Sequence, residues 1–173
     1  MANLIAYYSR KGQNYFGGKI KDLAKGNTEI VAEFIKKAVG GDLFEIETVK
    51  PYSKDYYECT EEAKRELNEN ARPQLKKYLA DLDGYDVIYI GYPNWWGTMP
   101  MAVFSFLERY DLTGKTIVPF CTNEGSGMGS SENDLAKLCP GAKIAKGLPI
   151  KGSSAAESEK KVAEWAKNAQ LKQ

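Results

Sequence analysis

Two adjacent tryptophans in a proline-bounded segment are the most unusual chemical feature of this sequence. Residues 93–100 read Pro-Asn-Trp-Trp-Gly-Thr-Met-Pro. Large aromatic side chains in an exposed loop suit stacking on a flat ligand; the alternative is that Trp95 and Trp96 simply pack onto the core. Because adjacent residues of an extended loop tend to point in different directions, we expect at least one of them to face outward. Gly97 lets the backbone adopt a positive φ or turn over.

A second segment, residues 122–129, alternates glycine with small or flexible residues: Thr-Asn-Glu-Gly-Ser-Gly-Met-Gly. Such a loop lets the backbone approach a ligand closely and offers its N–H groups to that ligand. The alternative is a flexible surface turn.

The third segment comes in two parts, Ser-Arg-Lys-Gly at residues 9–12 and Gly-Asn-Thr-Glu at residues 26–29. The second part opens an amphipathic helix, whose exposed N–H groups and dipole favour an anion. The alternative is an ordinary helix cap at Asn27 or Thr28. The stretch between them, residues 12–25, is longer than most strand-to-helix connections, which predicts a functional or mobile loop. The fingerprints of P-loop and dinucleotide-binding proteins are absent.

The apolar pattern predicts the elements that position these segments. Short continuous apolar runs suit strands that are covered on both faces, as in a parallel sheet. Five strands are expected at residues 4–8, 43–48, 87–92, 116–121, and 143–145 together with 148–150. Helices are expected over residues 28–39, 60–70, 73–82, 101–109, 131–138 and 155–171.

Strands that alternate with helices predict an α/β fold, here a three-layer α/β/α sandwich around a five-stranded parallel sheet. A length of 173 residues predicts a single domain over residues 1–173. Ligands of such sheets bind beyond the carboxyl ends of the strands. Since the three segments follow the first, third and fourth strands, we expect them to meet at that edge.

The composition excludes several kinds of chemistry. The chain has no histidine, which excludes Ser-His-Asp and Cys-His nucleophiles and histidine metal sites. Its net charge of +1, from 24 basic and 23 acidic residues, predicts no nucleic-acid partner and no membrane surface. The widely spaced Cys59, Cys121 and Cys139 predict no disulfide framework. With no signal-peptide pattern and no membrane-spanning apolar run, we expect a cytoplasmic protein.

Together, Tyr8-Ser9 and residues 26–29, 93–98 and 122–127 resemble signatures of the flavodoxin family of FMN-binding proteins, and the likeness covers nearly the whole chain. The resemblance implies a strand order of 2-1-3-4-5 and FMN at the carboxyl edge of the sheet. Residues 9–11 resemble the first half of a split phosphate loop. Residues 26–28 resemble its second half, and residues 12–14 are the competing assignment. The implied cofactor-binding residues are Ser9, Arg10, Lys11, Gly26, Asn27, Thr28, Pro93, Asn94, Trp95, Trp96, Gly97, Thr98, Thr122, Asn123, Glu124, Gly125 and Gly127.

The resemblance also implies how the flavin ring is held. Trp95 or Trp96 resembles the aromatic residue that packs on the isoalloxazine ring. The segment 122–129 has no tyrosine for the opposite face, so that face is either open or covered by the inserted stretch. A backbone carbonyl near Gly97 is implied to turn toward N5 of the reduced ring.

Three functions are compatible with such a fold. The first is an electron carrier between partner proteins. The second is an FMN-dependent oxidoreductase that takes hydride from NAD(P)H and reduces a quinone or another small acceptor. The third, a phosphoacceptor receiver domain, needs an aspartate where this chain has Pro93.

The first two functions are close alternatives. The near-neutral charge argues against a carrier steered by an acidic field. Tyr52, Tyr56 and Tyr57 either line a small-substrate pocket or pack under the crossover helix. No residue stands out as an acid–base catalyst. We favour electron transfer through the flavin, and the oxidoreductase stays open as the alternative.

Overall fold

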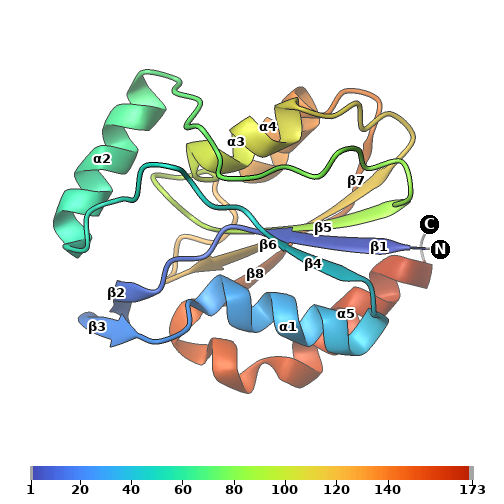
Figure 1. Ribbon diagram of the computed structural model, residues 1–173. Helices are drawn as coiled ribbons and strands as arrows, with labels where there is room; N and C mark the ends of the chain where they lie inside the picture. Colours follow the sequence, from blue (N-terminus) through green and yellow to red (C-terminus); the bar gives the residue numbers. More distant parts are fainter. Residues whose placement is uncertain (1, 172–173) are drawn as a thin grey trace.

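A single parallel sheet forms the centre of the computed structural model, which describes residues 2–171 (Figure 1). Its strands run in the order β4-β1-β5-β6-β7, and β8 also pairs with β6. Because β7 and β8 pair with successive parts of β6, they act as one interrupted fifth strand, and the expected order 2-1-3-4-5 is confirmed. The strands are β1 (Asn3–Tyr7), β4 (Asp42–Glu45), β5 (Val87–Pro93), β6 (Thr116–Asn123), β7 (Lys143–Ile144) and β8 (Leu148–Lys151).

Helices cover both faces of the sheet, as predicted for a three-layer sandwich. In Figure 1, α1 (Asn27–Val39) and α5 (Glu159–Leu171) lie on one face, and α3 (Met101–Glu108) and α4 (Ser131–Leu138) lie on the other. The helix α2 (Tyr56–Asn68) lies at the side of the sheet's carboxyl end.

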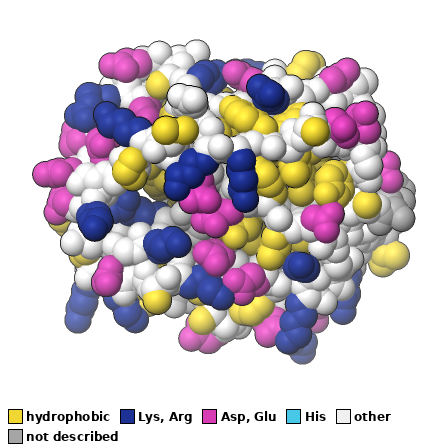
Figure 2. Space-filling model, viewed as in Figure 1, with side chains coloured by type: hydrophobic (Ala, Val, Ile, Leu, Met, Phe, Trp, Pro, Cys, Tyr) yellow, Lys and Arg dark blue, Asp and Glu magenta, His cyan; other side chains and the backbone are white. Residues whose placement is uncertain are grey.

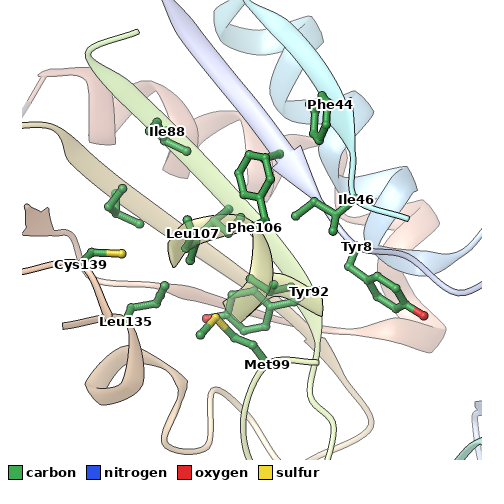
Figure 3. Packing of buried hydrophobic residues seen from close by; sticks show 14 of the residues in the cluster. Tyr8, Phe44, Ile46, Ile88, Tyr92, Met99, Phe106, Leu107, Leu135 and Cys139 are labelled. Carbon is green, nitrogen blue, oxygen red and sulfur yellow. The ribbon is translucent and has the colours of Figure 1, made fainter. Parts of the chain in front are cut away.

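Each face of the sheet has its own apolar core, and α3 dominates one of them. In that core Phe106 and Leu107 pack over the β5 residues Ile88 and Tyr92 (Figure 3). The ring of Phe106 stacks on Phe44 of β4 with centroids 5.3 Å apart. Full burial of such side chains contributes about 1.5–3 kcal/mol each, which fixes the strand ends rigidly enough to position the loops that follow them.

The inserted stretch forms a β-hairpin, which the sequence analysis did not predict. Strands β2 (Gly12–Phe16) and β3 (Lys19–Leu23) pair antiparallel and form a separate two-stranded sheet. Gly17 and Gly18 make the turn with φ values of 61° and 88°. Two successive positive φ values are the signature of a two-residue turn that matches the twist of a hairpin. The hairpin projects beyond β1, on the same side of the molecule as α2 (Figure 1).

The helix predicted over residues 73–82 is wrong. This segment is irregular and runs antiparallel to the end of the second strand region, with a bridge between Thr48 and Leu75. Val49 N–H donates to the Gln74 carbonyl at 2.8 Å, and Lys76 N–H donates to the Glu47 carbonyl at 2.9 Å. Backbone groups that pair with a neighbouring segment cannot also form the hydrogen bonds of a helix.

Two helix starts also differ from their predicted positions. The helix expected from residue 60 begins at Tyr56, because the Asp55 side chain caps it by accepting from Glu58 N–H at 2.9 Å. The predicted helix over 155–171 is preceded by a 3₁₀ turn, η1 (Gly152–Glu157), and its α-helical part begins at Glu159.

All three cysteines are free and buried, in agreement with the prediction of no disulfide framework. Burial raises the pKa of Cys59 and Cys139 to about 11 and that of Cys121 to about 12. Within residues 2–171, no helix combines the length and apolar character needed to cross a bilayer.

Candidate functional site

A cleft of about 630 Å³ opens at the carboxyl end of the sheet. Its walls come from the hairpin, the start of α1, the first half of α2 and the loops after β5 and β6. The three segments predicted to meet at this edge therefore do meet. The predicted residues that line the cleft are Arg10, Asn27, Pro93, Asn94, Trp95, Trp96, Thr122, Asn123 and Glu124.

The start of α1 forms one end of this site and is built for close approach. The Ser9 hydroxyl accepts a hydrogen bond from Glu29 N–H at 3.1 Å. A Cβ atom on Gly26 would lie 2.2 Å from the Ser9 hydroxyl oxygen, so only glycine fits there. The N–H groups of Asn27 and Thr28 have no hydrogen-bond partner among residues 2–171. Unpaired N–H groups at a helix N-terminus are an anion site.

The competing second half of the loop, residues 12–14, is committed to the hairpin. The Gln13 side chain accepts from Tyr56 N–H at 2.8 Å, and the Asn14 amide donates to the carbonyls of Arg10 and Gly12. The geometry therefore favours residues 26–28 as the anion-binding half.

The Arg10 carbonyl lies beside Gly26 at the start of α1, whereas the Arg10 side chain bonds on the α2 side of the site. The Arg10 guanidinium donates to the carbonyls of Gln13, Ser53 and Lys54 at 2.8–3.2 Å, which ties the hairpin to the segment before α2. Arg10 thus lines the cleft on its α2 side. Lys11 is exposed and does not line the cleft.

The two tryptophans take different positions, and one of them, Trp96, faces outward as expected. Trp95 packs edge-on against Tyr8 and Tyr52, with centroids 5.2 and 5.1 Å away. Trp96 is 49% exposed, and its indole N–H donates to the Thr60 carbonyl at 2.8 Å. Its φ of +56° is unusual for a residue with a side chain, and it turns the ring outward toward α2.

The loop after β5 is held on both sides. Asn94 donates to the Gly127 carbonyl and accepts from Gly97 N–H, both at 2.9 Å. Thr98 is buried, and its hydroxyl donates to the Asp134 carboxylate of α4. The Thr98 hydroxyl is therefore bonded to α4, and Thr98 does not line the cleft; the flavin contact that the resemblance implied for it stays a prediction.

The loop after β6 connects the other walls of the cleft. The hydroxyls of Thr122 and Thr28 hydrogen-bond at 2.8 Å and join the end of β6 to the first turn of α1. The Asn123 side chain accepts from Gly125 N–H at 2.9 Å. Glu124 accepts from Gly17 N–H and from the Ser153 hydroxyl, each at 3.2 Å, so it fastens the hairpin tip.

Several residues that line the cleft were not predicted from the sequence. Tyr15 comes from the hairpin, and Cys59 and Thr60 come from α2. The Gly-Gly pair was an available signal for the hairpin. The three tyrosines of residues 52–57 take two different roles. Tyr56 and Tyr57 line the cleft. Tyr52 instead packs on Trp95, and its hydroxyl donates to Glu66 at 2.5 Å.

A doubly wound parallel sheet with unpaired N–H groups at a helix start and an aromatic cleft at its carboxyl edge is the arrangement in which one class of α/β proteins binds nucleotides. The family model for flavodoxin matches residues 20–169. This chain belongs to the flavodoxin family.

Solved structures with the same architecture span nearly the whole chain. A proposed flavoprotein from Bacteroides uniformis is 31% identical with a TM-score of 0.77, covering 96% of this chain and 97% of that one. One from Bacteroides eggerthii is 32% identical with a TM-score of 0.76, covering 96% of each chain. A flavoprotein from Lactobacillus acidophilus, solved in complex with FMN, is 21% identical with a TM-score of 0.65, covering 90% and 97%. The comparison with curated proteins gives no match.

Proposed function

We propose that this chain binds FMN in the cleft and transfers electrons through it. The observation that carries this proposal is the pairing of an unpartnered helix start with an aromatic cleft. The N–H groups of Asn27 and Thr28 suit the phosphate, and Trp96 and the loop after β6 suit the ring. A cleft of about 630 Å³ lies within the range of roughly 300–1,000 Å³ that is usual for small-molecule sites.

FMN, when bound, supplies the redox chemistry, and the protein binds it and tunes its potential. The residues of this chain do the positioning. Gly26 and Ser9 shape the anion end, and Asn94 holds the loops after β5 and β6 at a fixed separation. Glu124 and Arg10 hold the hairpin in place as one wall of the cleft.

Two electron partners remain as candidates, a redox protein and a small molecule. On the face in Figure 2, basic and acidic side chains are interspersed. A mixed surface provides little long-range steering toward a charged protein partner. A small-molecule partner is favoured by the exposed aromatic side chains that line the cleft. With such a partner, the protein would be an NAD(P)H-dependent oxidoreductase that reduces a quinone or another small acceptor.

FMN binding is tested by titrating FMN into apoprotein and following the quenching of flavin fluorescence. Gly26→Ala should weaken binding at least about tenfold, because its Cβ has no room beside Ser9 and the Arg10 carbonyl. Gly84→Ala is the matched control, since a Cβ there meets nothing within 4 Å. Equal FMN affinity of the two variants would show that the FMN phosphate does not bind at the start of α1.

The electron partner is tested anaerobically on FMN-loaded protein. Rapid loss of the oxidised flavin spectrum on adding NADPH or NADH would identify an oxidoreductase. Loss only with dithionite or a partner reductase would identify a carrier.

A further inference from the structure

Every exposed large aromatic side chain among residues 2–171 lines the same cleft. Tyr15, Tyr57 and Trp96 are 42%, 63% and 49% exposed, and all three are cleft residues. Exposed aromatic rings leave apolar surface in water, and a cluster of them around one opening marks a binding site. The rings come from three separate elements, the hairpin, α2 and the loop after β5, so the fold gathers them.

Three of the rings around the cleft form a continuous surface, which we call the tyrosine wall: Tyr15, Tyr56 and Tyr57. The rings of Tyr15 and Tyr56 lie 6.3 Å apart and are inclined by 32°, and those of Tyr56 and Tyr57 lie 5.5 Å apart, edge to face. The wall spans the hairpin and the first turn of α2. It is distinct from the anion end, which is formed by residues 9 and 26–28.

The tyrosine wall is held in place by polar contacts rather than by a buried core. Gln13, two residues before Tyr15, accepts from Tyr56 N–H at 2.8 Å. Arg10 bridges from the base of the hairpin to the carbonyls of Ser53 and Lys54. Both contacts fix the distance between hairpin and helix, so the wall is pre-organised. Pre-organisation reduces the entropy cost of binding a ligand.

Arg10 also brings a positive charge to the cleft. Its Nε and Nη2 atoms donate to backbone carbonyls, whereas Nη1 donates to no residue within 2–171. No carboxylate of the described chain forms an ion pair with it. A guanidinium with N–H groups left over is a directional donor for an oxygen acceptor on a ligand.

We propose that the tyrosine wall and Arg10 form a second binding site of the cleft, for a planar aromatic carbonyl compound of the quinone class. The proposal rests on FMN occupying the anion end of the same cleft. Flat rings stack well on exposed aromatic faces, and a quinone oxygen can accept from the free N–H groups of Arg10. The site requires the hairpin, because the hairpin contributes Tyr15 and positions Arg10.

The test uses oxidised, FMN-saturated protein and menadione as the probe, with binding measured by calorimetry. FMN saturation is established first for each variant in a separate titration. Tyr57→Ala should weaken menadione binding by about tenfold, the usual effect of losing a stacking ring and its contact area. Tyr57→Phe should restore it, because the ring rather than the hydroxyl is used. Val49→Ala is the control, since Val49 is 49% exposed and does not line this cleft.

Methylnaphthalene is the matched ligand, because it keeps the fused rings and lacks the carbonyl oxygens. It should bind at least about tenfold more weakly than menadione, since it offers nothing to Arg10. Equal affinity of the two ligands, equal affinity of wild type and Tyr57→Ala, or no saturable menadione binding would each overturn the inference. Failure of the first titration would instead show that FMN does not bind, and would overturn the proposed function together with this site.

Discussion

The backbone carbonyl of Gly97 accepts two hydrogen bonds from Ser130, one from its N–H at 2.7 Å and one from its hydroxyl at 3.1 Å. This carbonyl is therefore committed to the start of α4. The Trp96 carbonyl is the one left without a hydrogen bond in this turn, counting residues 2–171. Turning that peptide over would break the bond from Gly97 N–H to Asn94. If a carbonyl near Gly97 turns over as expected, it is therefore the Trp96 carbonyl, in the peptide between Trp96 and Gly97.

Gly97→Ala should destabilise the apoprotein by about 1–2 kcal/mol, because φ at Gly97 is +87° and a Cβ is strained there. A Cβ at Gly97 meets no atom within 4 Å, so the effect is purely conformational. Urea unfolding measures it, and Gly84→Ala, with equally open space and no positive φ, should change the free energy of unfolding far less. In FMN-loaded protein, Gly97→Ala should also bring the two one-electron reduction potentials of the flavin closer together. An unchanged difference between them would show that Gly97 does not tune the flavin potentials.

The sheet and the position of the site were predictable from sequence because both depend on local patterns. Continuous apolar runs identified β5 and β6 within two residues of their ends. The rule that loops meet at the carboxyl edge of a parallel sheet then brought the Trp95 and Glu124 loops to one cleft.

What could not be predicted depends on long-range pairing. Residues 73–82 have helical composition, yet their backbone pairs with residues 47–49. The direction of the Arg10 side chain is set by carbonyls more than 40 residues away. Thr98 faces α4 because the Asp134 carboxylate accepts a hydrogen bond from its hydroxyl. None of these contacts leaves a trace in the local sequence.

Removing one hydroxyl of the buried Thr28–Thr122 pair should lower the free energy of unfolding more than removing both hydroxyls. The two oxygens lie 2.8 Å apart, and both residues are nearly fully buried. Thr28→Val leaves the Thr122 hydroxyl without its partner, which costs about 1–3 kcal/mol. The double Thr28→Val, Thr122→Val variant leaves no orphan and should recover part of that loss. Urea unfolding of all four proteins gives the coupling energy; strictly additive effects would contradict a buried hydrogen bond between them.

Cys59 should report on occupancy of the cleft. It lines the cleft yet is buried, and burial raises the pKa of its thiol to about 11. At pH 8 only about one thiol in a thousand is then ionised, so iodoacetamide should label native Cys59 slowly. Saturating FMN should slow the labelling further at Cys59, but not at Cys121 or Cys139, which do not line the cleft. Mass spectrometry assigns the label to each cysteine, with urea-unfolded protein as the fully reactive reference. Identical labelling of Cys59 with and without FMN would place the cofactor elsewhere.

Glu124 should control how firmly the hairpin closes over the cleft. Its carboxylate is the contact that joins the hairpin tip, at Gly17, to the loop after β6 and to Ser153 of η1. A hydrogen bond to a charged acceptor contributes about 1.5–3 kcal/mol when buried and less at an exposed site. Glu124→Ala should therefore speed amide hydrogen exchange at Gly17 by roughly tenfold. It should also raise the FMN dissociation rate, because an opened hairpin uncovers the cleft. Glu157→Ala removes the same charge from an exposed carboxylate with no hydrogen bond to residues 2–171, so both rates should stay at their wild-type values. If Gly17 exchanges equally fast in both variants, Glu124 does not fasten the hairpin, and the cover over the cleft depends on Arg10 and Gln13 alone.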